Sequence, residues 1–180
     1  PAASPAKSSC VCNPGYAGSF GAADNPCTAC AVGKFSIEGI SSGYASRSCA
    51  LCPADSSSPV GSDGVDDCFC NAGYTGSDGG TCAVCAAGTY KIDTGSDDCI
   101  ACGSGKYSTT VGATSDVCQA CPANSNAPAA SNELTDCICD AGYTGSDGGT
   151  CTACVAGKYK INTGSDACTD CGSGKYSTTV

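Results

Sequence analysis

The chain lacks the residues on which most enzymes and most globular cores depend. Its 180 residues include no His, no Met and no Trp, and only two Leu and three Phe. Without His, and with its carboxylates dispersed, the sequence offers no acid–base or nucleophilic constellation. The scarcity of large apolar side chains means that burial alone cannot offset the entropy lost on ordering the chain. We therefore predict a protein that is not an enzyme, has no cofactor and depends on covalent cross-links.

Positive charge and membrane-spanning runs are also missing. Eight Lys and Arg stand against 17 Asp and Glu, which gives a formal net charge of −9. Such a surface repels phosphate backbones, so we expect no nucleic-acid partner. No signal peptide, transmembrane run or lipidation motif is present. Because Pro1 is not an initiating Met, we expect a mature fragment or part of a longer protein, with any membrane attachment outside it.

What the sequence has in abundance is cysteine, at 20 residues. They form ten close pairs, spaced Cys-x-Cys or Cys-x-x-Cys, separated by loops without charged clusters. An even count at regular spacing is typical of a disulfide framework made in an oxidising compartment, so we predict an extracellular protein, secreted or on the cell surface. Zinc is disfavoured because each four-thiolate site carries a net charge of about −2, which eight cations cannot offset five times over. Thioredoxin-type redox chemistry is disfavoured because such a redox site lies at the start of a helix, whereas these cysteine pairs recur in loops.

The chain is an internal repeat. Residues 70–111 and 139–180 are identical at 33 of 42 positions, at a constant offset of 69 residues. The loop "CNAGYTGSDGGTC" at 70–82 thus returns as "CDAGYTGSDGGTC" at 139–151. We divide the chain into a degenerate cysteine-rich repeat at 1–67, a full repeat at 68–136 and a partial copy at 137–180.

The loops themselves predict a small, disulfide-rich fold that is mostly irregular. β-Branched and aromatic segments such as "KYSTTV" and "TYKI" precede turn residues, which indicates short two-stranded β-ribbons and no helices, in an elongated rod of tandem repeats. "PADSSSP" and "PANSNAP" are expected to be extended strips. In eight loops the sequence Cys-x-x-Gly supplies a glycine for positive φ, and the aromatic that follows is expected to form a miniature core. These aromatics are Tyr16, Phe35, Tyr74, Tyr90, Tyr107, Tyr143, Tyr159 and Tyr176.

Two disulfide pairing schemes fit the ten pairs. In the interleaved scheme the first Cys of a four-Cys block bonds the third and the second bonds the fourth, as in Cys82–Cys99 with Cys85–Cys102, and all twenty are paired. In the ladder scheme the last Cys of each pair bonds the first Cys of the next. The ladder comprises Cys12–Cys27, Cys30–Cys49, Cys52–Cys68, Cys70–Cys82, Cys85–Cys99, Cys102–Cys118, Cys121–Cys137, Cys139–Cys151 and Cys154–Cys168.

The ends of the sequence favour the ladder without excluding the other scheme. Residues 1–3 align with 53–55 and with 122–124, and both of these segments directly follow a Cys. The partner of Cys10 would then precede Pro1, and Cys171 would bond forward to a residue beyond Val180. Spacing alone does not decide connectivity.

These motifs resemble known families. "CxCxxGYxG" at 68–76 and 137–145 resembles the C-terminal half of an EGF-like module, and "CxxCxxGxYKxxTGSDxCxxC" followed by "CPANS" resembles ephrin-receptor-like cysteine-rich repeats. The Cys-x-x-Gly-x-Tyr loop is also similar to the first loop of tumour-necrosis-factor-receptor modules. The resemblance implies elongated, disulfide-laddered rods, as in surface or mastigoneme-type filament proteins of protists and algae. The acidic motif of calcium-binding EGF modules is absent.

Residue chemistry offers candidate positions for bound calcium and for O-linked glycans. The calcium candidates are the carboxylates of Asp63, Asp66, Asp67 and Asp78, although Gly-Ser-Asp is more often simple turn chemistry. The sequence has no Asn-x-Ser/Thr sequon. Ser residues near Pro and Ala are candidates for O-linked glycans, namely Ser4, Ser8, Ser9, Ser57 and Ser58.

The sequence leads to two functional hypotheses. The first is a structural component of an extracellular filament or surface fibre, whose partners are copies of itself in a homo-polymer. Near-identical loops favour it, because a lattice requires the same contact surface many times. The second is a rod-like ectodomain of a surface receptor or adhesin that binds a protein or glycan ligand.

Overall fold

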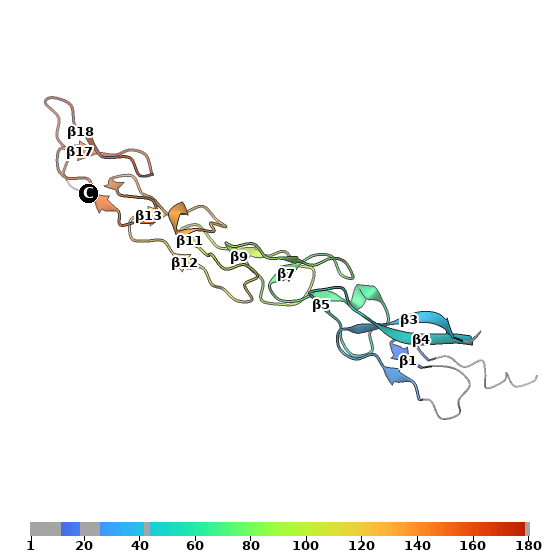
Figure 1. Ribbon diagram of the computed structural model, residues 1–180. Helices are drawn as coiled ribbons and strands as arrows, with labels where there is room; N and C mark the ends of the chain where they lie inside the picture. Colours follow the sequence, from blue (N-terminus) through green and yellow to red (C-terminus); the bar gives the residue numbers. More distant parts are fainter. Residues whose placement is uncertain (1–11, 19–25, 42–43, 179–180) are drawn as a thin grey trace, which may run out of the picture. The chain divides into compact units, whose positions relative to one another are not determined.

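The computed structural model describes residues 12–18, 26–41 and 44–178 (Figure 1). The chain forms two compact units, the first made of 1–83 with 93–98 and the second of 84–92 with 99–180. The division falls inside the middle repeat at 68–136, whose boundaries stay a prediction from the sequence. In the first unit the segment 93–98 joins the preceding loop, because Gly95 N donates to Cys70 O at 2.9 Å.

Short antiparallel ribbons are the main regular structure, as predicted. Every sheet among the described residues has two strands. In the first unit the pairs are β1 (Tyr16–Ala17) with β2 (Thr28–Ala29), β3 (Lys34–Ser41) with β4 (Tyr44–Leu51), and β5 (Ser56–Ser57) with β6 (Phe69–Cys70). β7 (Tyr74–Thr75) and β8 (Ala83–Val84) lie where the chain passes from the first unit to the second.

The second unit repeats one arrangement, in which a two-residue strand pairs with residues beside the Cys that closes its loop. The pairs are β9 (Thr89–Tyr90) with β10 (Ile100–Ala101), β11 (Lys106–Tyr107) with β12 (Gln119–Ala120), β13 (Ser125–Asn126) with β14 (Ile138–Cys139), β15 (Tyr143–Thr144) with β16 (Thr152–Ala153), and β17 (Lys158–Tyr159) with β18 (Thr169–Asp170). Ribbons this short are not stable alone. A disulfide lies next to each of them and holds the two strands together.

The β3–β4 hairpin is the exception in length. Its strands pair over eight positions, from Lys34 opposite Leu51 to Ser41 opposite Tyr44. The hairpin lies beside β1 in the first unit (Figure 1), and Gly18 and Arg47 exchange backbone hydrogen bonds of 3.0 and 3.2 Å across that side. The sequence places this hairpin in the degenerate repeat, where the loop is longer than its counterparts.

A left-handed residue begins each ribbon loop. In all eight Cys-x-x-Gly loops the glycine has positive φ, from +75° at Gly33 to +86° at Gly142, as predicted. In the two Cys-Pro-Ala loops the same position is held by Asp55 and Asn124, with φ of 60° and 61°. Asp and Asn are the residues other than glycine that most readily adopt this conformation.

The interior consists of disulfides and small side chains. The buried apolar residues among those described are ten Cys together with Ala113 and Ala127. The prediction of a tyrosine core is wrong, because no Tyr whose side chain the structure describes is buried, and Tyr159 and Tyr176 are 43% and 87% exposed. Consecutive residues of a strand point to opposite sides. The aromatic therefore faces outward when the residue after it faces the disulfides.

The only helices in the described part of the chain are single 3-10 turns, η2 (Val65–Asp67) and η3 (Leu134–Asp136). The expected extended strips are instead turned segments, since Ser56 N donates to Pro53 O and Ser125 N donates to Pro122 O. The left-handed residues Asp55 and Asn124 cause these turns. No helix in the described residues has the length and apolar character needed to cross a membrane.

Candidate interaction surface

Nine disulfides join the described residues, and they are the nine bonds of the ladder scheme, from Cys12–Cys27 to Cys154–Cys168. Their Cα–Cα distances are 5.5–5.8 Å. The interleaved bonds are not formed, because Cys82 bonds Cys70 and Cys85 bonds Cys99. Cys171 has no disulfide partner among the described residues, and Cys10 lies outside them.

Backbone hydrogen bonds connect each disulfide loop with the next. Gly88 N donates to Ser108 O at 2.7 Å, and Gly88 O accepts from Cys102 N at 2.8 Å. One loop further on, Gly105 N donates to Ala127 O at 2.8 Å. The left-handed glycine thus directs both its N–H and its C=O toward adjacent segments of the same chain. These bonds supply the loop-to-loop contact that the disulfides alone do not provide.

In six of the ten loops the third residue after the left-handed position is buried in this contact. They are Ser36, Ser58, Lys91, Ser108, Ala127 and Lys160, none more than 9% exposed. Ser108 N donates to Ser131 O at 3.1 Å, so the buried side chain lies beside the backbone of the following loop. Small side chains such as Ser and Ala let two backbones approach at this position, and in two loops a lysine, Lys91 or Lys160, occupies it instead.

Close approach of backbones also explains the glycines of the repeated loop "GYTGSDGGT". A Cβ on Gly79 would lie 2.8 Å from Val65 O of η2, and one on Gly148 would lie 2.9 Å from Leu134 O of η3. A Cβ on Gly76 would lie 2.3 Å from Thr81 O. The glycines therefore recur because each loop tip packs closely on a 3-10 turn or on its own backbone.

Lys160 fastens the tip of its disulfide loop, residues 161–166, in the second unit. Its side chain is 9% exposed, and its Nζ donates to Tyr143 O at 2.8 Å and also to Gly164 O. The same tip is tied by Gly164 N donating to Cys139 O at 2.8 Å and by Thr144 Oγ1 donating to Asp166 O at 3.0 Å. This role of Lys160 was not predicted from the sequence. The signal was a lysine, shared with Lys91, at a position that in the other loops carries Ser, Ala or Gly.

Substituting Lys160 by Met will loosen this tip. The change leaves two backbone carbonyls without their charged donor, and such hydrogen bonds contribute about 1.5–3 kcal/mol. We expect hydrogen exchange at Gly164 N to accelerate roughly 10- to 100-fold. Lys158→Met is the matched control, because Lys158 pairs with Asp170 at 2.8 Å with side chains 39% and 80% exposed, and a surface pair of this kind contributes little. Equal acceleration in both variants would contradict the assigned role.

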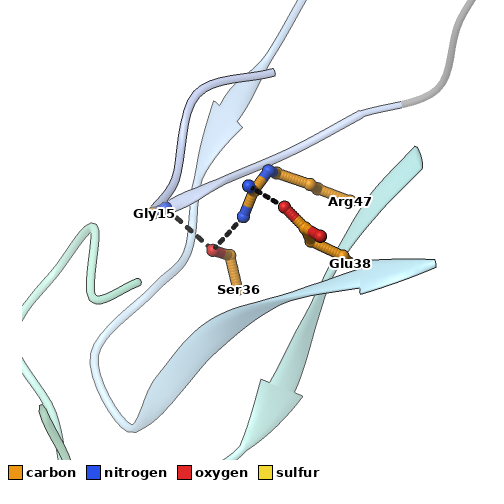
Figure 2. Close-up of polar contacts among 4 residues, drawn as sticks. All are labelled: Gly15, Ser36, Glu38 and Arg47. Carbon is orange, nitrogen blue, oxygen red and sulfur yellow. Dashed lines mark hydrogen bonds and ion pairs between the residues drawn. The ribbon is translucent and has the colours of Figure 1, made fainter. Parts of the chain in front are cut away.

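A second polar cluster fastens the long hairpin (Figure 2). Gly15 N donates to Ser36 Oγ at 2.8 Å, and the Arg47 guanidinium donates to Ser36 Oγ at 3.5 Å and to Glu38 Oε1 at 2.5 Å. The Arg47 side chain is 13% exposed, whereas that of Glu38 is 79% exposed. Arg47 is the only arginine in the chain. The guanidinium is therefore engaged in joining β3, β4 and the first loop, and the cluster contains no nucleophile activated by a base.

The calcium candidates do not converge. Asp67 Oδ2 accepts from Asp63 N at 2.9 Å and from Gly64 N at 3.3 Å, so it caps the turn that leads into η2. Asp63, Asp66 and Asp78 are exposed. No group of three or more His, Cys, Asp or Glu side chains is arranged to hold a metal among the described residues.

The glycan candidates are divided by burial. Ser58 is 3% exposed and its hydroxyl donates to Lys34 O at 2.9 Å, and a glycan there stays a prediction. Ser57 is half-buried in β5. Ser4, Ser8 and Ser9 lie outside the described residues, and glycans there stay a prediction.

These features define a tandem array of disulfide loops joined by backbone contacts. Residues 73–117 match the family model described as tyrosine-protein kinase ephrin type A/B receptor-like. The match begins at the left-handed Gly73 and includes the Cys85–Cys99 bond, so the predicted resemblance to ephrin-receptor-like repeats is confirmed there. A search of curated proteins finds no match to this chain. The family match and the nine disulfides indicate an extracellular or cell-surface domain.

Proposed function

We propose that the chain is a structural component of an extracellular filament or surface fibre, without catalytic activity, whose partners are further copies of itself. The observation that carries the proposal is the recurrence of loop contacts at the 69-residue offset. Gly79 N donates to Cys68 O at 2.8 Å in the first unit, and Gly148 N donates to Cys137 O at 2.7 Å in the second. A unit that reuses the same contacts can be stacked any number of times.

The recurrence extends to side chains. Thr75 Oγ1 donates to Asp97 O at 3.0 Å, and Thr144 Oγ1 donates to Asp166 O at 3.0 Å. Because equivalent loops have equivalent geometry, they present equivalent surfaces. Such surfaces suit repeated contacts within a lattice, whereas a single ligand site requires one distinctive surface.

Negative-stain electron microscopy of the protein as isolated from its source, with thiols blocked, tests the proposal. Filaments with a constant axial repeat are the expected result. Dispersed single particles at high protein concentration would exclude the structural role.

The alternative is the ectodomain of a receptor or adhesin that binds a protein or glycan ligand. The β3–β4 hairpin favours it, because this element has no counterpart in the other loops and Ile37 on it is 42% exposed. Under this alternative the isolated protein stays dispersed, and truncating the hairpin abolishes attachment to cells.

A further inference from the structure

The β3–β4 hairpin has a strand edge that no other described residue covers. Consecutive residues of an antiparallel strand point their backbone N–H and C=O groups to opposite edges. Arg47 of β4 exchanges two backbone hydrogen bonds with Gly18, so its N–H and C=O point away from β3. Arg47 lies opposite Glu38 in the hairpin. The backbone N–H and C=O of Glu38 therefore point away from β4, toward the outer edge of β3.

This outer edge of β3 is unpaired from Glu38 onward. Two residues earlier, Ser36 N donates to Ser62 O at 3.0 Å, which confirms the direction that alternate residues of β3 take. Beyond Ser36, no backbone hydrogen bond from the described part of the chain reaches the outer edge at Glu38 or Ile40. An unpaired edge of this kind is a template for a further strand.

The charge of the hairpin does not oppose association between copies. From Lys34 to Leu51 the sequence has two cations and one carboxylate, a net charge of +1, within a chain whose net charge is −9. The one carboxylate, that of Glu38, is paired with the Arg47 guanidinium at 2.5 Å (Figure 2). Two copies that meet at this edge thus avoid the unpaired carboxylates that repel one another elsewhere.

We propose that two copies of this chain pair through β3, antiparallel and related by a two-fold axis at Gly39. This register places Glu38 of each copy opposite Ile40 of the other, so both residues exchange backbone hydrogen bonds with the second copy. Like charges directly opposite one another destabilise a sheet, and here no two carboxylates are opposite. Gly39 faces its own counterpart, with no side chain between the two strands.

A second copy fits this edge because it brings an identical β3, with the same unpaired groups over the same length. Apart from β3 and β4, every strand in the described residues has only two residues. The inference rests on the proposed structural function, in which the partners are copies of the chain. A two-fold contact closes on itself, so this one joins copies in pairs, and a polymer needs a further contact elsewhere.

Disulfide cross-linking at Gly39 tests the register. In an antiparallel pair that exchanges no hydrogen bonds, the Cα atoms lie about 4.5 Å apart, which a disulfide spans. The atom nearest to a Cβ on Gly39 would be Ser46 Oγ at 3.6 Å, so Gly39→Cys fits the folded chain. The variant is made together with Cys10→Ala and Cys171→Ala, which leaves the nine disulfides in place.

Ile37→Cys in the same background is the matched control. The Ile37 side chain is 42% exposed, and in this register it lies roughly 14 Å from its counterpart along the paired strands. On mild oxidation we expect Gly39→Cys to form a disulfide-linked dimer at least about tenfold faster than Ile37→Cys. Equal rates would mean that the copies meet without this register, and the pairing would be wrong.

A proline substitution tests the edge by a separate measurement. Glu38→Pro removes the outward N–H and leaves the β3–β4 ladder, since proline is tolerated where the N–H of an edge strand points outward. Glu38→Ala is the control, because it removes the same side chain and keeps the N–H. Peptide mapping of the Cys30–Cys49 bond, which closes this loop, establishes that each variant is folded.

Sedimentation velocity of the oxidised chain up to about 1 mM, at roughly 0.15 M salt, measures association. We expect Glu38→Pro to weaken it about 30-fold or more and Glu38→Ala less than about fivefold. If the unsubstituted chain associates and both variants resemble it, the edge pairing is wrong while the structural function stands. If the unsubstituted chain stays monomeric throughout, the proposed function fails and the pairing fails with it.

Discussion

Replacing both Cys102 and Cys118 by Ala will open the middle of the second unit and leave its later loops closed. The bond spans a sequence separation of 16 residues, and a cross-link of this length contributes on the order of 3 kcal/mol. Gly88 N and Ser108 N report on the change, because each donates to backbone across these loops, at 2.7 and 3.1 Å. We expect their protection from hydrogen exchange to fall about 100-fold.

The effect will be local because each loop contacts mainly its neighbours. Cys154 N and Gly164 N donate at 2.8 Å to Gly142 O and Cys139 O, and their protection should change less than about threefold. Cys171→Ala is the control, since it removes a cysteine without removing a disulfide. Equal loss at Gly164 N would show that the unit unfolds as a whole. Unchanged protection at Gly88 N would show that the loop contacts are independent of the cross-link.

The sequence predicts the loops of this protein better than it predicts their interior. Cysteine spacing and the Cys-x-x-Gly motif predicted ribbons that begin at a left-handed glycine; the left-handed glycines are present from Gly15 to Gly174, and ribbons follow them as far as Gly157. The same sequence suggested a tyrosine core, which is wrong. With two-residue strands, nothing in the pattern states which of two neighbouring residues faces the disulfides. That choice depends on how the next loop packs, which is tertiary information.

The Cys-Pro-Ala loops show a motif that was present but not recognised. Asp55 and Asn124 align with the glycine of the other loops, and they adopt the same positive φ. Proline suggested an extended strip because it fixes its own backbone, yet it constrains only the residue before it. The residue two positions later turns the chain into β5 or β13. Alignment to the full set of loops would have predicted the turn.

Some features of the candidate site could likewise be predicted from the sequence, and others could not. The repeated glycines could be located in the sequence, whereas the Arg47 cluster could not, because it joins Gly15, Ser36 and Glu38 from separate segments. Lys160 was equally hidden. A lysine in an acidic, cysteine-rich chain is ordinarily assigned to the surface, and only the carbonyls of Tyr143 and Gly164 show why this one is buried.

Substituting Gly88 by Ala is expected to disrupt folding more than any other single glycine-to-alanine change in its loop. Gly88 has φ of +82°, and a Cβ there would lie 2.3 Å from Ala130 O and 2.8 Å from Ser131 O. The left-handed conformation costs a residue with a Cβ about 1–3 kcal/mol, and forcing an extra carbon into packed surroundings costs roughly 1–3 kcal/mol more. Ala130 cannot simply move away, because its N–H donates to Cys102 O at 2.9 Å.

Two further substitutions separate backbone strain from the steric clash. Gly157 has φ of +83° with nothing within 4 Å of its Cβ position, so Gly157→Ala keeps the strain alone. Gly103 has nothing within 4 Å and no positive φ, so Gly103→Ala has neither. The readout on oxidative refolding is the yield of the native bond that closes each substituted loop, which is Cys85–Cys99 for Gly88→Ala, Cys154–Cys168 for Gly157→Ala and Cys102–Cys118 for Gly103→Ala. This yield should be lowest for Gly88→Ala, intermediate for Gly157→Ala and unchanged for Gly103→Ala. Similar yields for the first two would mean that glycine recurs in these loops for its conformational freedom alone. The predicted order of yields would instead show that close contact between neighbouring loops is a further reason that these loops require glycine at this position.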